Sequence, residues 1–397
     1  MDRLYYRDSY LKEFEAEVIE RSTMSDRPAV VLNRTAFYPA SGGQPNDKGS
    51  LNGIRVLDVI EDADRIVHLL EKEVAQTDVR GVIDWKRRFG HMQQHTGQHI
   101  LSQSFIRIAH AETIGFHMSD EVSNIDLDVA SIQEDTLWKA EDHANSIVQQ
   151  DLPVNVIFTD ESGLSRFDLR KDPAKTGEIR IIEIEGFDAS ACGGTHLRST
   201  GEAGLIKIRK CEKIGSKMRV EFYCGSRALH DYRWKNSLIF KYANQFTVGE
   251  KELGDAIERL EEENKSYKKE LKDVRERLLV YEAEEMLKKA EVLKGCSIVR
   301  ALFEGRDLQE MKILSSLLKK REKVVALLAV RGEGATLVFS RSDDLKIDIA
   351  GVLKRCLDLI GGRGGGRPDS AQGGGPDVAM IEKALELAYS LIVSELS

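Results

Sequence analysis

The first 84 residues alternate short apolar runs with turn-forming residues. Runs such as AVVLN, IRVLDVI and RIVHLL are rich in β-branched side chains, and SGGQPNDKG concentrates glycine, proline and asparagine. Short β-branched runs that are bounded by such residues are typical of antiparallel strands. Residues 1–84 are therefore predicted to form a small antiparallel barrel or sandwich.

Residues 85–225 mix helix and strand signals. A helical stretch begins at Trp85 and continues through HMQQHTGQHILSQSFIRIAH, and a second helix is expected around residues 131–149. The runs VSNIDLDV and PVNVIF have strand character, and GLIKIRKCEKIGSKMRVEFYCG is predicted to be a closing hairpin. This second region is predicted to be an α+β domain.

Residues 226–293 are predicted to form a long helical, coiled-coil-like region. Apolar residues recur there in steps of three and four, with Asn264 at the one polar position of the seam. The seam consists of Leu253, Ile257, Leu260, Tyr267, Leu271, Val274, Leu278 and Tyr281. It either packs against a preceding helix (228–246) of the same chain or joins two chains as a homodimer, and the two arrangements can coexist.

Residues 294–397 alternate strand and helix signals, as expected for an α/β layer domain. Within them, GGRGGGRPDSAQGGG has the composition of a flexible linker. Its position between a strand–helix unit and a final helix favours an ordered loop instead. The predicted fold class is therefore α+β and multidomain, with four regions.

Composition narrows the functional classes. The chain has 397 residues, a formal net charge of −8 and five cysteines at wide spacing. This balance disfavours a general nucleic-acid coat but allows local basic patches, and the odd cysteine count fits a reducing cytoplasm. Neither a secretory signal nor a membrane-spanning stretch is expected.

Two histidine-containing motifs suggest a metal site. His91, His95 and His99 are spaced four apart, which places them on one helix face, although a single HxxxH is more often a solvated polar face. Roughly a hundred residues later, SACGGTH brings Cys192 and His196 together across two glycines. Thiolate and imidazole are ligands that zinc prefers, so the two motifs together predict a zinc site.

The ordered motifs resemble one family. HMQQHTGQHILSQ followed by CGGTH is similar to the editing domain of alanyl-tRNA synthetases and of the free-standing AlaX proteins. FYPASGGQPNDKG, IDWKRRFGHM and GEAGLIKIRKCEKIGSKMRVEF resemble further motifs of that domain. GGRGGGRPDSAQGGG resembles the glycine-rich signature of the DHHA-type domain that ends alanyl-tRNA synthetases.

The resemblance implies a ligand set for Zn²⁺. The family pattern HT-x-x-H selects His95 and His99, and CGGTH adds Cys192 and His196. His91 is left outside the ligand set, in a supporting or, by preference, a surface position. The resemblance further directs attention to two candidate catalytic residues, which are Thr96 as the contact for a serine hydroxyl and His117, where many relatives carry glutamine.

The activity that the resemblance implies is aminoacyl-tRNA deacylation. The substrate would be tRNA(Ala) mischarged with serine, or with glycine, and the reaction would be zinc-dependent hydrolysis of the ester without ATP. A hydrophobic alanine pocket rejects an added hydroxyl by only about a hundredfold, so a second site that hydrogen-bonds this hydroxyl improves fidelity. Contacts to tRNA are expected from Gly42, Gly43, Gln44, Arg363 and Arg367.

Other classes fit the sequence less well. A complete alanyl-tRNA synthetase would need an activation domain, for which the stretch before the editing motifs is expected to be too short. A phosphoesterase of the DHH type would need an Asp-His-His triplet, and the sequence contains none. The alternative that remains is a non-catalytic tRNA-binding protein with a structural zinc.

Overall fold

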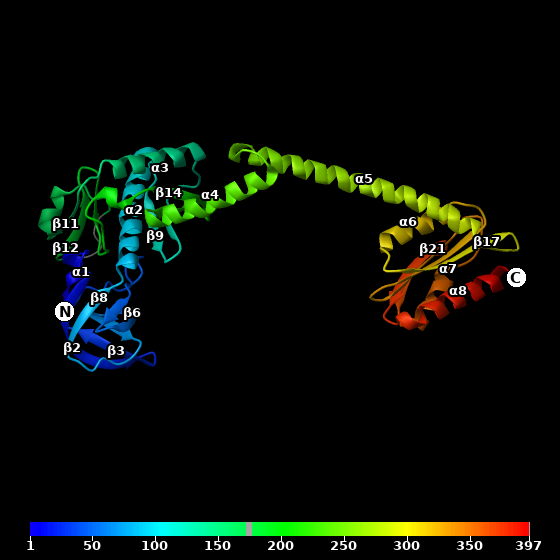
Figure 1. The fold of residues 1–397 in the computed structure, drawn as a ribbon, viewed down its shortest axis with the longest axis horizontal. Helices are drawn as coiled ribbons and strands as arrows, with labels where there is room; N and C mark the ends of the chain where they lie inside the picture. Colours follow the sequence, from blue (N-terminus) through cyan, green and yellow to red (C-terminus); the bar gives the residue numbers. More distant parts are fainter. Residues whose placement is uncertain (172–176, 397) are drawn as a thin grey trace. The chain divides into compact units, whose positions relative to one another are not determined.

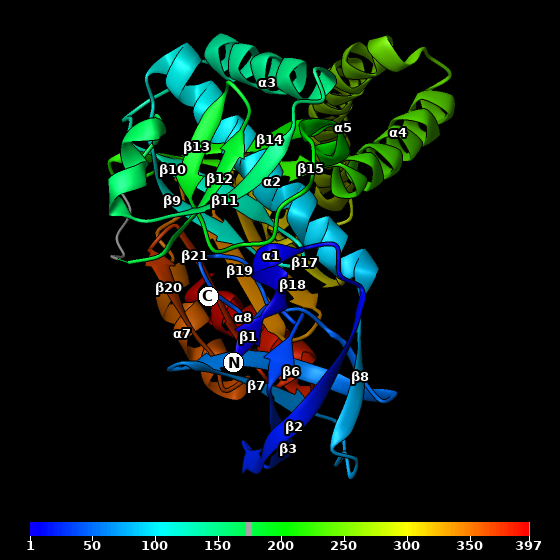
Figure 2. The same cartoon turned by 90° about the vertical axis from the view of Figure 1, so that its left-hand side faces the viewer.

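The computed structural model describes residues 1–171 and 177–396. The chain divides into two compact units, Met1–Tyr242 and Ala243–Ser397, and the division falls within helix α4 (Ser226–Phe246). Figures 1 and 2 show the elements of each unit, and each unit is described here by itself. Among the described residues, no helix has both the length and the apolar character that crossing a membrane requires.

The first unit begins with a closed barrel of six antiparallel strands. Their order is β2-β3-β7-β6-β5-β8. The bounds are β2 (Glu13–Met24), β3 (Arg27–Leu32), β5 (Gly49–Leu51), β6 (Ile54–Asp62), β7 (Arg65–Leu70) and β8 (Asp78–Ile83). In β2 the alternation of sequence places Phe14, Ala16 and Val18 in the barrel core and the residues between them in solvent. Strand β1 (Asp2–Arg3) and a short helix α1 (Leu4–Arg7) precede the barrel strands. β1 pairs in parallel with β4 (Arg34–Thr35), which lies between β3 and β5 in the sequence.

Helix α2 (Trp85–Ala109) leads from the barrel into the rest of the first unit, where α3 (Glu134–Gln149) packs against it (Figure 1). Asp84 caps α2 by accepting a hydrogen bond from the Arg87 amide, at 3.2 Å. Although α2 is polar along much of its length, every residue from His91 to Ser102 is buried. Gly97 lets it approach the sheet closely, because a β-carbon there would lie 2.2 Å from the Cys224 sulfur.

Two sheets complete the first unit. One has the order β14-β15-β10-β9, and the other the order β11-β12-β13 (Figure 2). The bounds are β9 (Thr113–Met118), β10 (Ser123–Leu127), β11 (Val154–Thr159), β12 (Ile179–Ile184), β13 (Asp188–Ala191), β14 (Ile206–Ile214) and β15 (Lys217–Cys224). Their apolar faces form one core with α2 and α3, in which Met92, Phe105 and Phe222 are fully buried. This core holds α2 in place along its length.

The second unit is a six-stranded sheet with helices on both faces. The sheet order is β16-β17-β18-β19-β21-β20. Its elements are β16 (Glu291–Leu293), β17 (Cys296–Glu304), α6 (Leu308–Lys319), β18 (Val324–Arg331), β19 (Ala335–Arg341), α7 (Ile349–Leu359), β20 (Arg363–Arg367), β21 (Ser370–Gly375) and α8 (Ile381–Leu396). Alternate residues of β18 enter two cores, Leu327 with α7 and α8, and Leu328 with α6. The mixed α+β, multidomain class is confirmed.

The glycine-rich segment of this unit is a β-hairpin, and the prediction of an ordered loop was wrong. Strands β20 and β21 pair antiparallel, and β21 continues the sheet through β19. The glycines allow close packing rather than flexibility. A β-carbon at Gly364 would lie 2.3 Å from the α-carbon of Gly373, and one at Gly373 would meet the Leu357 side chain at 2.7 Å. The repeated glycines are therefore a requirement of close strand and helix approach.

Helix α5 (Leu253–Lys288) carries the predicted heptad seam. Seven seam residues, namely Ile257, Leu260, Tyr267, Leu271, Val274, Leu278 and Tyr281, are between 43% and 68% exposed in the single chain. The last turns of α5 pack against the sheet and helices of the second unit, where Leu279 and Ala283 join the core beside α6. The rest of the seam is apolar surface.

Candidate metal centre

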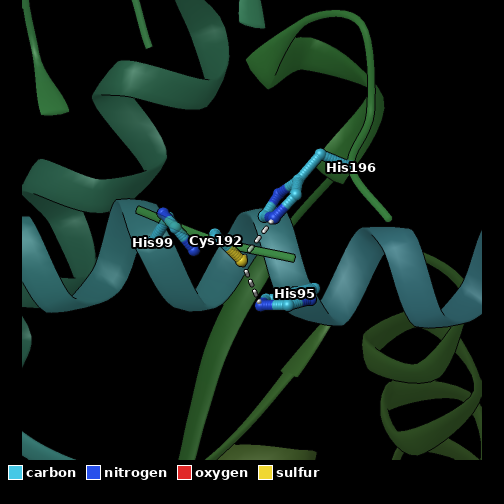
Figure 3. Close-up of side chains that lie close together, drawn as sticks. All are labelled: His95, His99, Cys192 and His196. Carbon is cyan, nitrogen blue, oxygen red and sulfur yellow. Dashed lines mark hydrogen bonds between the residues drawn. The ribbon is translucent and has the colours of Figure 1, made fainter. Parts of the chain in front are cut away.

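Four side chains from two elements converge inside the first unit (Figure 3). His95 and His99 come from consecutive turns of α2, and Cys192 and His196 come from the loop that follows β13. Their ligand atoms all lie within 4.8 Å of one another, and the three histidines are buried while Cys192 is partly buried. The structure thus brings together the four residues that the family pattern selected.

Each imidazole of the cluster is held by a hydrogen bond at its Nδ1 atom. His95 Nδ1 lies 2.8 Å from Gln44 Oε1. His99 Nδ1 lies 3.2 Å from Asp188 Oδ2, and His196 Nδ1 lies 3.2 Å from Thr96 Oγ1. A partner at one ring nitrogen fixes the orientation of the ring and leaves the other nitrogen, Nε2, available to a metal.

The CGGTH loop is shaped by its glycines and by a buried arginine. A β-carbon at Gly194 would lie 2.1 Å from His95 Cε1, so another side chain at this position would displace a ligand ring. Arg180 donates from Nη1 to the carbonyl oxygens of Cys192 and Gly194, at 2.6 and 2.9 Å. Arg180 thus ties the loop to β12, and Gly194 lets the loop approach His95 of α2.

The electrostatics favour a thiolate beside a neutral imidazole. Burial raises the pKa of the Cys192 thiol, but His95 and His196 outweigh burial and hold it well below its usual value. Burial, together with the charge of His95, lowers the pKa of His196 well below the usual value. A thiolate and a neutral imidazole are the protonation states in which these groups bind a metal.

The arrangement fits zinc. Four donors at about 2.0–2.3 Å from a tetrahedral ion lie roughly 3.3–3.8 Å from one another. Cys192 Sγ lies 3.5 Å from His95 Nε2, within this range, and 3.2 Å from His196 Nε2, just below it, while the four ligand atoms together lie within 4.8 Å of one another. One sulfur and three imidazole nitrogens are also a donor set that zinc accepts.

Other predicted site residues have varied surroundings. Gln44 is buried against His95 and Thr195, with Nε2 2.8 Å from Thr195 Oγ1. Gly42 and Gly43 form the adjoining turn with positive φ angles of 56° and 84°. His117 is an exposed residue of β9. Arg363 and Arg367 are exposed at the two ends of the edge strand β20 of the second unit.

His91 is not the surface residue that the sequence favoured. Its side chain is 2% exposed, and its Nε2 lies 3.3 Å from Asp120 Oδ1. The polar face of α2 is covered by the turn that contains Gln44, by β9 and by the start of α4. Exclusion from the ligand set therefore did not place His91 in solvent. The same burial overturns the alternative in which all three histidines lie on a solvated helix face.

Sequence reasoning missed two residues of the centre. Phe116 of β9 stacks on His95, with ring centroids 5.3 Å apart and an interplanar angle of 28°. Asp188 holds His99, and Arg170 Nε lies 3.4 Å from its second oxygen. The signal for Asp188 was a carboxylate directly before the ASACGGTH segment, whereas nothing local marked Phe116.

Comparison with known proteins places three family models along the chain. Residues 8–87 match tRNA synthetases class II (A). Residues 179–220 match the threonyl and alanyl tRNA synthetase second additional domain, and residues 295–394 match the DHHA1 domain. Their order follows that of the motifs described above.

Individual relatives extend over nearly the whole chain. Alanine–tRNA ligases of Pyrococcus abyssi and Methanoregula boonei are 33% and 34% identical over 98% and 99% of this chain. The chain spans less than half of their length, 43% and 44%. The alanyl-tRNA editing protein AlaX-L of Pyrococcus horikoshii is 31% identical over 94% of both chains. This chain therefore belongs to the family of alanyl-tRNA editing proteins of the AlaX-L type.

Proposed function

We propose that the protein is a zinc-dependent deacylase that hydrolyses the ester of tRNA(Ala) mischarged with serine or glycine, in the cytoplasm. The observation that carries this proposal is the buried cluster of His95, His99, Cys192 and His196, with each imidazole held at Nδ1. Its membership in the family of alanyl-tRNA editing proteins supports the substrate class.

The residues of the centre divide the work. His95, His99, Cys192 and His196 would hold zinc, which would act as a Lewis acid toward an ester carbonyl or a water molecule. Gln44, Thr96 and Asp188 keep the imidazole rings in their binding orientation. Phe116 covers one face of His95 and limits the access of bulk water to it.

Thr96 is proposed to recognise the serine hydroxyl as well. Its Oγ1 accepts a hydrogen bond from the Leu197 amide at 3.1 Å and lies 3.2 Å from His196 Nδ1. Thr96 is fully buried beside the cluster. With both neighbours donating, its hydroxyl hydrogen remains to donate to a serine oxygen that enters the site. Correctly attached alanine would leave this donor unpaired, which is the basis of discrimination.

Release of serine from Ser-tRNA(Ala) by the full chain, with Ala-tRNA(Ala) as the control substrate, tests the proposal. We expect serine release with bound zinc, loss of release after chelation, and recovery when zinc is restored. Absence of zinc-dependent release would refute the proposal. Thr96→Val should reduce the preference for the serine ester about tenfold or more, because it removes one hydroxyl at similar volume. The comparison is made at saturating zinc, because the variant also loses the contact to His196 Nδ1.

A structural zinc in a non-catalytic tRNA-binding protein is the second candidate. It is favoured by the number of protein ligands, because four protein ligands describe a closed site whereas catalytic zinc usually keeps an open position. The two functions separate in the same assay. A structural zinc predicts that chelation lowers the unfolding temperature and that the zinc-bound protein binds tRNA without releasing serine.

The proposed tRNA contacts and the proposed dimer lie outside the metal cluster. The turn at Gly42 and Gly43 adjoins Gln44, so it is proposed to contact the tRNA end. Arg363 and Arg367, exposed on β20, are proposed to contact tRNA phosphates. The exposed seam of α5 is proposed to pair with the same seam of a second chain.

A further inference from the structure

A pocket lies beside the metal centre in the first unit. It has a volume of about 650 Å³, which is within the usual range of about 300–1,000 Å³ for ligand sites. Its walls come from the first turns of α2, the start of α4 and Asp120 in the loop after β9. His91, which the metal centre does not use, forms part of the wall one helical turn before the ligand His95.

The pocket combines aromatic and cationic side chains. Trp85 and Phe89 lie with ring centroids 5.6 Å apart, and Lys86 and Arg227 bring positive charge. Both carboxylates of the wall are engaged within the chain, because Asp84 caps α2 and Asp120 pairs with Arg87. Within the described part of the chain, Arg227 makes one long hydrogen bond, from Nη1 to Ser123 Oγ at 3.4 Å. Its charge is thus available to an anionic ligand.

His91 presents an unpaired acceptor. Its Nε2 carries the hydrogen, since Asp120 Oδ1 at 3.3 Å only accepts. Burial and then the charge of Arg87 lower the pKa of His91 to about 4, so the ring is neutral at pH 7. Its buried Nδ1 has no hydrogen-bond partner among the described residues. Unpaired buried acceptors are rare because each costs free energy, and this one indicates a donor supplied by a ligand.

We propose that this pocket binds an unpaired nucleotide at the 3′ end of tRNA, next to the terminal nucleotide whose ester lies at the metal centre. A base would stack on Phe89 and Trp85, and its phosphate would meet Lys86 and Arg227. The exocyclic amino group of cytosine or adenine supplies the kind of donor that the buried His91 Nδ1 lacks. His91 and His95 are separated by about 6 Å along α2, which is compatible with neighbouring nucleotides of an extended strand.

This inference rests on the proposed deacylase function, and two substrates separate the pocket from the chemistry. The first is a minihelix RNA with the alanine acceptor stem and its unpaired 3′ end, charged with serine. The second is 3′-O-seryl-adenosine, which has no preceding nucleotide. Arg227→Gln should raise KM for the minihelix about tenfold and leave kcat unchanged. The variant loses a contact to the phosphate, and this contact also positions the stacked base. Hydrolysis of seryl-adenosine should not change.

Two further variants control this measurement. Arg233→Gln removes an exposed arginine of α4 that lies outside the pocket, and it should leave both KM values unchanged. Lys86→Gln alters an exposed side chain of the pocket and should raise KM for the minihelix about threefold without affecting folding. The assignment of the pocket would be overturned if each variant changed KM for the minihelix and for seryl-adenosine by the same factor. It would also be overturned if neither variant changed KM for either substrate.

Trinucleotide binding provides a readout that does not depend on activity. In a Trp138→Phe/Trp234→Phe background, Trp85 is the remaining tryptophan, and CCA trinucleotide should quench its fluorescence. Arg227→Gln should weaken the binding about tenfold. If the zinc-bound protein hydrolyses neither ester but CCA still quenches Trp85, the proposed function fails and the pocket stands. If the protein hydrolysed the esters but CCA did not quench Trp85 fluorescence, the assignment of the pocket would be refuted and the deacylase function would stand.

Discussion

Helices α2 and α5 are both long and polar, but one is buried and the other is exposed. The 25 residues of α2 include fifteen buried ones, whereas only Ala256, Leu279 and Ala283 are buried among the 36 residues of α5. The apolar pattern does not explain this difference, because α5 has the clearer apolar stripe. The difference lies in the partners that surround each helix.

Several buried polar groups of α2 have partners elsewhere in the first unit. Arg88 is fully buried, and its guanidinium pairs with Asp47 and donates to the Ser9 carbonyl at 2.9 Å. Gln94 accepts from the Cys224 amide and donates to the Cys224 carbonyl, both at 2.9 Å. An unpaired buried group costs about 1–3 kcal/mol, so these bonds define one position for the helix. The metal ligands His95 and His99 are held in place because they lie on this fixed helix.

Helix α5 keeps its apolar seam at the surface of the single chain. Burial of apolar area contributes about 25 cal/mol per Å², and this contribution is available only when another surface covers the seam. The two helices thus use polar residues in opposite ways. In α2 the polar residues fix the position of the metal ligands. In α5 the polar residues face solvent, and the apolar seam between them is the surface that a partner can cover.

The largest effect is expected when the centre on α2 loses a ligand. Cys192→Ala should remove the thiolate and reduce both the bound zinc and serine release to background. Zinc content by mass spectrometry under native conditions and the release rate would be measured on the same preparation. Cys211→Ala, at a partly buried cysteine of β14, is the matched control and should retain zinc. Full activity of Cys192→Ala would contradict the assigned centre.

A smaller effect is expected from the carboxylate behind a ligand. Asp188→Asn keeps the shape of the side chain but removes the charge that faces His99, and zinc affinity should fall about 10–100-fold. Competition with a chelator measures this affinity directly. The exposed Asp142 of α3 offers a control, Asp142→Asn, with unchanged affinity. If the Asp188→Asn protein bound zinc with the same affinity as the wild-type protein, Asp188 would not orient His99.

Local patterns predicted most of the elements, with the exception of strands β20 and β21, but not the partners of the site residues. The start of α2 at Trp85 and the fold class followed from periodicity and turn residues, and the HTxxH and CGGTH motifs are each contiguous in sequence. Gln44 and His95 are 51 positions apart, and His99 and Asp188 are 89 positions apart. No local pattern joins such pairs, and the four-ligand set was selected through a family resemblance.

The errors have a shared physical cause. His91 was expected at the surface because polar side chains usually face solvent, and the GGRGGGR segment was expected to be an ordered loop because glycine-rich stretches are typical of loops rather than strands. Both are ordered by neighbours that the local sequence does not reveal. His91 is covered within the first unit, and Gly373 makes room for Leu357 of α7.

A glycine in each helix tests how tightly the two are packed. Gly97→Ala in α2 would place a β-carbon 2.2 Å from the Cys224 sulfur, and it should lower the free energy of unfolding by about 1–3 kcal/mol. Gly254→Ala in α5 meets nothing within 4 Å and should raise this free energy by up to about 1 kcal/mol through helix propensity. Chemical denaturation of both variants measures the contrast. Equal stabilities would refute the difference in packing.

The smallest effect on the folded chain, but a clear one on assembly, is expected at the seam of α5. Leu271 is 52% exposed, so Leu271→Glu should change the free energy of unfolding of a single chain by no more than about 0.5 kcal/mol. In a seam shared by two chains it would bury two like charges, and sedimentation should show a shift from dimer to monomer. Glu270→Gln, next to it but off the seam, should leave the assembly unchanged. If the wild-type protein sedimented as a monomer, the proposed dimer would be refuted. The seam would then need a partner within its own chain.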